Sequence, residues 1–342
     1  MKVSIIIPVY NAGRFLENAL HSISGQTLTD FECVCVDDGS TDNSSDIING
    51  FAKDDPRFKL IRQPNSGPAA ARNHGIDVSS GEYVCCVDAD DVLPPDALAV
   101  LVSLADSSQA DVTWGQHRRF TGNGAFGKCG LSAGCKVFSG GEWQNWFNGR
   151  FAQEKTDDPY YGIPVVPWNK MIRRTSLGTL RFPENRDVIG GEDIMFCAML
   201  LPRMNTVAVS AAVTYGYRTV ESSLNNSRSP VWLSRYSKAY VEVAKILRDR
   251  PLAVRNFARS ALRPGFIRQA LDAFVLTNRA KTESESDQEL RRAFSRLAKA
   301  YCAAADAKMV FWLRLGGYGC FSLLAFLYRR SSLYRKSRGW SE

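Results

Sequence analysis

The first 115 residues alternate between two apolar patterns, and this alternation restricts the possible folds more than any other feature of the chain. Short continuous apolar runs are typical of strands buried on both faces. The segments between them repeat apolar residues at helical spacing, and residues 68–78 begin with a proline at an early helical position. The expected strands span 3–7, 31–36, 58–61, 83–87 and 111–114. Such alternation predicts an α/β fold with a mostly parallel central sheet flanked by helices.

The rest of the chain divides into an irregular part, a mixed part and a helical part. Residues 116–165 are Gly-rich and irregular, 168–218 return to mixed helix and strand, and 229–307 have a helical pattern. We therefore expect one main domain over 1–228, with halves of about 1–115 and 116–228, and a helical C-terminal region over 229–342.

The positive charge of the chain is concentrated at its C-terminus. Seven Lys or Arg and one Glu lie in 308–342, so about +6 of the net +8 is there. A nucleic-acid-binding protein usually carries basic residues across a folded face, so no nucleic-acid partner is expected. The apolar run 315–328 is shorter than the roughly 20 residues of a membrane span. With its flanking aromatic and basic residues, 309–342 predicts a tail lying on an anionic membrane surface, or alternatively a core helix.

The N-terminus and the cysteines indicate the compartment. Met1-Lys2 leads directly into an apolar strand, without the apolar region of a signal peptide. Nine Cys is an odd number, and four of them lie inside strand-like runs, which is typical of buried thiols in a reducing compartment. The expected location is cytoplasmic, peripheral at the inner face of the cell membrane.

An acidic cluster follows the fourth expected strand. Asp88, Asp90 and Asp91 lie within four residues, at the strand end where α/β sheets bind ligands. Carboxylates this close repel one another unless a cation lies among them, and hard oxygen ligands favour Mg²⁺ or Mn²⁺. The alternative is a helix cap and turn before Pro94-Pro95.

Other strand ends also carry polar residues suited to a nucleotide. Asp37 and Asp38 follow the second strand, and such a carboxylate can accept the imide N–H of uracil. Tyr10 offers an aromatic face for a base. Arg72 offers a forked cation for a carboxylate or pyrophosphate, or alternatively is a solvated helix charge.

Four ordered motifs together resemble glycosyltransferase family 2. They are VSIIIPVYN at 3–11, VDDGSTD at 36–42, NxGxxxARNxG at 65–75 and DADD at 88–91. The resemblance covers about residues 3–105 and implies a glycosyltransferase A fold, which is similar to the Rossmann fold. It also implies an Asp-x-Asp motif at Asp88 and Asp90 that touches ribose, metal and pyrophosphate. The resulting candidates for nucleotide-sugar binding are Pro8, Tyr10, Asp37, Asp38, Gly67, Arg72, Asp88, Ala89 and Asp90, with Asp88 and Asp90 on the metal.

The second half of the family pattern is represented more weakly. Gly191-Glu192-Asp193 is similar to the segment that holds the family's general base, so we expect Asp193 as base with Glu192 second. The alternative is a helix N-terminus whose acids complement the dipole. Trp168, Lys170 and Asp91 are candidates for acceptor binding, although a Trp among apolar residues is more often core. Arg218 is a weaker candidate for a diphosphate contact.

These features predict an inverting hexosyl- or N-acetylhexosaminyltransferase that depends on Mn²⁺ or Mg²⁺. The resemblance implies a UDP-sugar as the donor, with GDP- and dTDP-sugars as alternatives. The expected acceptor is a saccharide or lipid-linked saccharide of bacterial envelope polysaccharide synthesis. The alternative is an inactive sugar-nucleotide-binding or scaffold protein of the same fold. The GxGxxG spelling at 122–127 lacks a strand-turn-helix context and predicts a loop.

Overall fold

The computed structural model describes the first 122 residues, several later segments and few positions beyond 220. The described residues are 1–122, 124, 126–129, 134–140, 142–143, 166–185, 191–220, 238–239, 241–243 and 245–246. They belong to two compact units. The first takes its described residues from Met1–Trp146, Glu154–Glu184 and Phe196–Val220, and the second includes those of Asn185–Met195. The predicted domain boundary at 228 and the predicted tail over 309–342 lie outside the described residues and stay predictions.

An eight-stranded sheet forms the centre of the first unit, in the order β3-β2-β1-β4-β7-β5-β8-β6. The strands are β1 (Val3–Val9), β2 (Phe31–Asp37), β3 (Phe58–Arg62), β4 (Tyr83–Cys86), β5 (Val112–Phe120), β6 (Cys135–Ser139), β7 (Lys170–Arg173) and β8 (Thr206–Arg218). Strand β1 pairs in parallel with β2 and β4, β2 with β3, and β5 with β8, whereas β7 and β6 run antiparallel to their neighbours. The mainly parallel sheet confirms the predicted α/β class.

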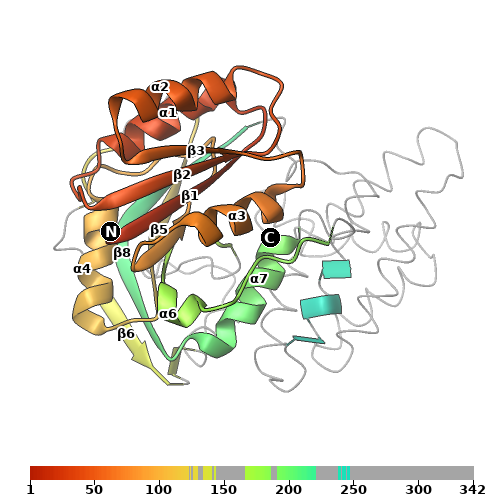
Figure 1. Cartoon of the computed structure of the whole chain (residues 1–342). Helices are drawn as coiled ribbons and strands as arrows, with labels where there is room; N and C mark the ends of the chain where they lie inside the picture. The colour runs from red at the N-terminus through yellow and green to blue at the C-terminus, as the bar shows by residue number, and fades with distance from the viewer. Residues whose placement is uncertain are drawn as a thin grey trace, which may run out of the picture. The chain divides into compact units, whose positions relative to one another are not determined.

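Helices cover both faces of this sheet (Figure 1). The described residues form the helices α1 (Gly13–Ser24), α2 (Ser44–Asp54), α3 (Pro68–Val78), α4 (Ala97–Ser108), α6 (Arg174–Leu177), α7 (Glu192–Leu200) and the short η2 (Leu201–Arg203). Ile5 and Ile7 of β1 share one buried core with residues of α1 and α4. Helix α3 packs on β1 and β2 so closely that a Cβ at Gly75 would lie 2.5 Å from Cγ2 of Ile6. Glycine is therefore required where α3 meets the sheet.

The prediction that residues 116–165 are irregular is wrong at two places. Strand β5 continues to Phe120, and residues 135–139 form β6 along the edge of β8. The sequence pattern hides the end of β5 because His117, Arg118 and Arg119 are polar, whereas the strand is held by backbone pairing with β8. Helix α2 begins at Ser44, and the carboxylate of Asp42 just before it accepts hydrogen bonds from the backbone N–H and the hydroxyl of Ser44.

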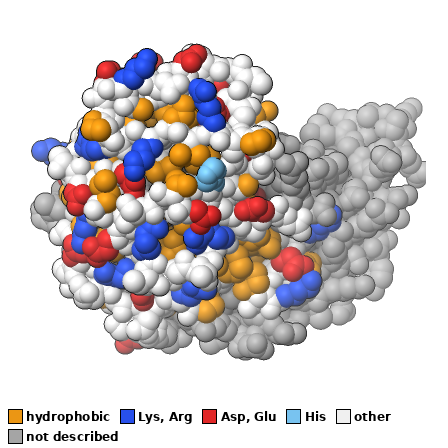
Figure 2. All heavy atoms as spheres, in the orientation of Figure 1, with side chains coloured by type: hydrophobic (Ala, Val, Ile, Leu, Met, Phe, Trp, Pro, Cys, Tyr) orange, Lys and Arg blue, Asp and Glu red, His pale blue; other side chains and the backbone are white. Residues whose placement is uncertain are grey.

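Three further facts concern the surface, the helices and the cysteines. On the face drawn in Figure 2, acidic and basic side chains lie side by side rather than in a single-sign patch. Within the part of the chain that the structure describes, no helix has the length and apolar character needed to cross a bilayer. The strand cysteines Cys33, Cys35, Cys85 and Cys86 are buried free thiols, as predicted.

Candidate active site

The parallel strands bring the sequence motifs to one edge of the sheet. Strands β1 to β4 share a direction, so their carboxyl ends lie together. Backbone hydrogen bonds join these ends: Asp38 N donates to Val9 O at 2.8 Å, and Gln63 N donates to Asp37 O at 3.0 Å. Such an edge is where α/β sheets usually bind ligands.

Asp38 is the buried acceptor at the end of β2. Its Oδ1 accepts hydrogen bonds from Gln63 Nε2 and Ser66 N, each at 2.8 Å, and its Oδ2 accepts one from Gly67 N at 2.8 Å. Gly67 has a φ of +94°, a conformation that favours glycine. An ionised carboxylate has about four acceptor positions, so Asp38 has capacity for one more donor.

Asp37 and Tyr10 have different surroundings from Asp38: Asp37 is hydrogen-bonded by nearby serines, and Tyr10 is exposed. Asp37 accepts hydrogen bonds from Ser40 N at 2.9 Å and from the Ser45 hydroxyl. Burial raises its pKa, but these hydrogen bonds outweigh burial and lower the pKa overall. Asp37 therefore stabilises its own turn. Tyr10 directly follows β1 and is 53% exposed, and the next residue, Asn11, donates its backbone N–H to Ser40 Oγ in that turn at 3.0 Å.

Arg72 reaches the acidic cluster from α3. Its side chain is 6% exposed, and its guanidinium donates to Asp88 Oδ1 at 2.9 Å, so the alternative of a solvated helix charge is wrong. The neighbouring Asn73 exchanges hydrogen bonds with the backbone of Phe182, whose ring lies 5.3 Å below the guanidinium. Asn73 belongs to the sequence motif. Its contact with Phe182 could not be predicted, because the two residues are more than 100 positions apart in the sequence.

The three carboxylates after β4 have different surroundings. Burial, and next the charge of Asp88, raises the pKa of Asp90 to about 6. Burial, and next the charges of Asp88 and Asp90, raises the pKa of Asp91 to about 8. A divalent cation would offset this crowding of negative charge, and the carboxylates of the half-buried residues Asp88 and Asp90 suit Mg²⁺ or Mn²⁺. The residues present therefore fit a metal held by these two side chains.

Strand β8 holds the same turn from its other side. The hydroxyl of Tyr215 donates to Asp91 Oδ2 at 2.7 Å, and Arg218 N donates to Asp91 Oδ1 at 2.7 Å. The guanidinium of Arg218 donates to Asp90 O at 2.5 Å, to Gly122 O, and to Asn18 Oδ1 at 2.7 Å. Arg218, a candidate for the diphosphate, is therefore engaged by the protein itself. Sequence reasoning missed Tyr215, because its role depends on the pairing of distant strands.

The predicted acceptor residues Trp168 and Lys170 are mostly buried. Trp168 is 7% exposed and stacks on Tyr215 and Tyr217, with ring centroids 4.8 and 5.2 Å away. Lys170 is 3% exposed, and its ammonium donates to Val166 O. Their assignment to the acceptor stays a prediction, and the packing gives both a structural part as well.

Two arginines at the end of β5 are exposed near this aromatic cluster. The guanidinium of Arg119 lies over Tyr217 at 5.6 Å, and that of Arg118 lies over Phe126 at 4.3 Å. Since β5 is parallel to β8, Arg119 lies at the same edge as Arg218. These exposed cations beside the site could not be predicted from the sequence, because residues 118–119 do not fit a strand pattern.

Glu192 and Asp193 form the first turn of α7. Glu192 is buried and Asp193 is half-buried. Both belong to the second unit. Their assignment as catalytic carboxylates stays a prediction.

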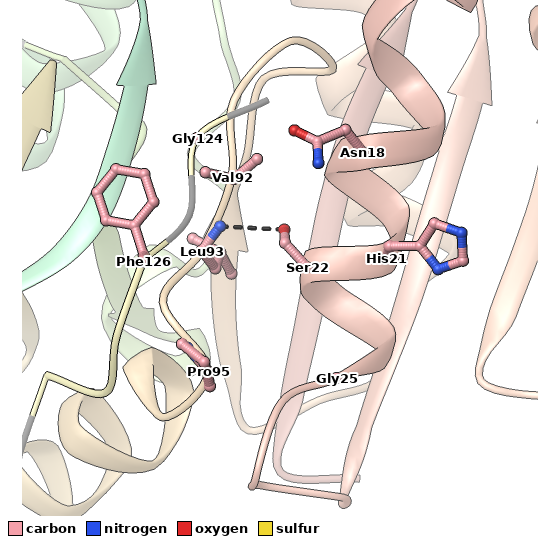
Figure 3. Close-up of a pocket in the computed structure, with 9 residues that line it drawn as sticks. All are labelled: Asn18, His21, Ser22, Gly25, Val92, Leu93, Pro95, Gly124 and Phe126. Atoms are coloured by element: carbon pink, nitrogen blue, oxygen red, sulfur yellow. Dashed lines mark hydrogen bonds between the residues drawn. The ribbon is translucent and has the colours of Figure 1, made fainter. Parts of the chain in front are cut away.

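A separate hollow of about 260 Å³ lies beside α1 (Figure 3). Asn18, His21 and Ser22 line it from the helix, and Val92 and Leu93 line it from the segment after the acidic turn. The Leu93 N–H donates to Ser22 Oγ at 3.0 Å. None of the sequence-predicted site residues is among the described residues that line this hollow, so it is distinct from the candidate active site.

Residues 4–181 match the family model described as glycosyl transferase family 2, and this match covers just over half of the chain. The chain belongs to glycosyl transferase family 2. It is 38% identical over 119 residues to the glycosyltransferase GlyG of Streptococcus pneumoniae, a match that covers 34% of this chain and 40% of GlyG. It is 27% identical over 313 residues to the putative glycosyltransferase EpsH of Bacillus subtilis, covering 89% of this chain and 83% of EpsH. Several other relatives are matched over about a third of their length, such as YibD of Escherichia coli at 32%.

Solved glycosyltransferases share the fold. TarS 1–349 of S. aureus in complex with UDP-GlcNAc gives a TM-score of 0.66 at 20% identity, covering 96% of this chain and 92% of that chain. The mannosyltransferase PcManGT from Pyrobaculum calidifontis, in complex with GDP-Man and Mn²⁺, gives 0.52 at 18% identity, covering 96% and 86%. The predicted glycosyltransferase A fold is confirmed.

Proposed function

We propose that the chain is an inverting, metal-dependent glycosyltransferase that moves a sugar from a UDP-sugar to a hydroxyl of a saccharide or lipid-linked saccharide. The observation that carries the proposal is the meeting of Asp38, Tyr10, Arg72 and the Asp88–Asp90 turn at one sheet edge. TarS structures hold UDP and UDP-GlcNAc, which supports a UDP-sugar and transfer of a hexosyl or N-acetylhexosaminyl group.

The nucleotide-binding roles follow from the contacts of each side chain. The free capacity of Asp38 Oδ2 suits the imide N–H of uracil, and the exposed ring of Tyr10 suits the base face. Pro8, Asp37, Gly67 and Ala89 shape the backbone around these two groups. Arg72 supplies a fixed positive charge beside the carboxylates, and this charge would stabilise the negative charge of a bound diphosphate.

Asp88 and Asp90 would hold Mn²⁺ or Mg²⁺. When bound, the cation neutralises charge on the departing diphosphate. Asp193, or else Glu192, accepts the proton of the acceptor hydroxyl as its oxygen bonds to the anomeric carbon. The bond from that carbon to the diphosphate oxygen breaks, and its electron pair leaves with UDP. One in-line displacement of this kind inverts the anomeric configuration.

The biological setting is bacterial envelope polysaccharide synthesis at the inner face of the cell membrane. One relative is the poly(ribitol-phosphate) beta-glucosyltransferase of Bacillus spizizenii, 41% identical over 128 residues that make up 36% of this chain and 20% of that protein. The basic, aromatic composition of 309–342 supports contact with an anionic membrane surface. Trp168 and Lys170 are the proposed acceptor side of the site, whereas Asp91, predicted with them, has both oxygens engaged by β8.

Calorimetric titration of UDP tests the nucleotide and metal parts together. The titration is run with Mn²⁺ and with EDTA, on the wild type, on Asp90→Asn, and on Asp54→Asn as a matched change at an exposed carboxylate of α2. We expect Mn²⁺-dependent binding in the wild type and Asp54→Asn, and its loss in Asp90→Asn. If UDP, GDP and dTDP all fail to bind the wild type with either metal, the enzyme proposal fails and a scaffold role replaces it.

A further inference from the structure

Asp91 differs from the two carboxylates that precede it in that both its oxygens are used inside the protein. Asp91 is 1% exposed, and its two oxygens accept hydrogen bonds from the Tyr215 hydroxyl and from Arg218 N, each at 2.7 Å. Both donors belong to β8. Its oxygens therefore point toward a strand of the sheet and are engaged there by neutral donors.

The hydroxyl of Tyr215 joins both ends of the acidic turn. It donates to Asp91 and also accepts a hydrogen bond from Asp88 N at 3.2 Å. Within the turn, Asp91 N donates to Asp88 O at 3.1 Å. One phenol oxygen thus fixes the backbone of the first aspartate and the side chain of the last.

Further contacts extend this attachment over the whole turn. Arg218 Nε donates to Asp90 O at 2.5 Å, and Val92 exchanges two backbone hydrogen bonds with Gly216 at 3.1 and 2.8 Å. The Tyr215 ring is fully buried and stacks on Trp168. A ring held on a packed Trp is a rigid support, so the hydroxyl has little freedom to leave the turn.

We propose that Tyr215 and Asp91 are positioning residues that fix the Asp88–Asp90 turn in the geometry that binds the metal and diphosphate. Residues that orient metal ligands typically change metal affinity 10- to 100-fold when they are removed. The proposal rests on the proposed function, and it replaces direct acceptor contact as the main role of Asp91.

Tyr215→Phe removes only the shared hydroxyl. Tyr83→Phe is the matched control, because Tyr83 is also fully buried and its hydroxyl donates to Asp106 Oδ1 at 2.8 Å from β4. Mn²⁺ is titrated into each protein at saturating UDP, and uridine binding is measured in EDTA. Thermal midpoints report the general loss of stability in both variants.

We expect the Mn²⁺ dissociation constant to rise about tenfold or more in Tyr215→Phe and to stay unchanged in Tyr83→Phe, with uridine binding alike in both. Asp91→Asn, which retains the shape of the side chain, provides a second variant and should weaken Mn²⁺ binding to a similar degree. Equal Mn²⁺ constants in Tyr215→Phe, Tyr83→Phe and wild type would overturn the inference, as would complete loss of binding in Asp91→Asn beside normal binding in Tyr215→Phe. A wild type that binds no nucleotide with metal would instead refute the proposed function.

Discussion

The guanidinium of Arg72 and the carboxylate of Asp88 form an ion pair at 2.9 Å in which the arginine is almost covered and the aspartate is partly open. The exposed fractions of the two side chains are 6% and 27%. Helix α3 therefore delivers a nearly fixed positive charge, while Asp88 keeps access to solvent and to a ligand. This asymmetry suits a carboxylate that shares its charge between a protein cation and a bound metal.

Replacing Arg72 should weaken binding of the diphosphate more than binding of the base. Arg72→Met removes the positive charge beside Asp88, so we expect UDP to bind at least about tenfold more weakly with Mn²⁺, and Arg72→Lys to recover only part of this loss. Calorimetry with UDP and with uridine separates the two effects. Arg181→Met is the control. Arg181 lies outside α3 and forms an exposed ion pair with Asp77, which lies on α3 as Arg72 does. Equal losses for UDP and uridine would indicate a general disruption of α3.

Metal binding should depend on pH through Asp90. Because the pKa of Asp90 is raised to about 6, a proton competes with the metal below that pH. We expect the apparent Mn²⁺ affinity to fall by about tenfold per pH unit below pH 6 and to level off above it. In the metal-free protein, stability changes with pH in the opposite direction. The raised pKa of Asp90 contributes to the free energy of unfolding below about pH 4, and this contribution is lost as pH rises through 6. Thermal midpoints and Mn²⁺ titrations between pH 4 and 8 measure both trends, and a flat Mn²⁺ profile would contradict the assignment of Asp90.

Asp38 and Asp37 should respond differently to the same substitution. Asp38→Asn puts an amide where the uracil imide needs an acceptor, so we expect uridine affinity to fall at least about tenfold, while binding of pyrophosphate with Mn²⁺ persists. Asp37→Asn affects hydrogen bonds within the turn to Ser40 and Ser45, and should mainly lower the free energy of unfolding, by about 1 kcal/mol. Unchanged uridine binding in Asp38→Asn would remove Asp38 from the base-binding residues.

Glu32 should control acid stability at the opposite edge of the sheet. Burial raises its pKa, but hydrogen bonds from Lys59, Ser80 and Ser4 outweigh burial and lower the pKa to about 2. The resulting stabilisation, at most about 3 kcal/mol, is present above about pH 4.5 and is lost as pH falls through 2. Urea unfolding of Glu32→Gln and wild type should therefore differ clearly at neutral pH and converge in acid. Glu82→Gln, an exposed carboxylate paired with Lys2 and Arg173, should cost no more than about 1 kcal/mol at any pH.

Local patterns were sufficient to predict the first half of the fold. Strands β1 to β4 and helix α3 could be predicted from continuous apolar runs and turn residues, because such patterns involve only residues that are close in the sequence. The insertion of β7 between β4 and β5 could not be predicted, because its pairing joins segments more than 50 residues apart. The end of β5 was missed for the same reason.

The candidate site divides in a similar way. Asp38, Asp88 and Asp90 could be identified because charged residues directly after buried strands indicate the ligand edge of a sheet. The burial of Trp168 agrees with the core alternative that its apolar neighbours indicated. The attachment of Asp91 to Tyr215 follows from the register of distant strands and has no local signal.

The place of β7 in the sheet has a consequence for engineering. Because β7 pairs on one side with β4 and on the other with β5, residues 170–173 join strands β1 to β4 to the rest of the sheet. A chimera cut near residue 115 would combine a β4 from one parent with a β7 from another, and a fragment ending there would leave the β4 edge without its partner. An exchange of segments between relatives should therefore keep β4, β7 and β5 from one parent and replace loops at the strand ends, rather than a half-domain.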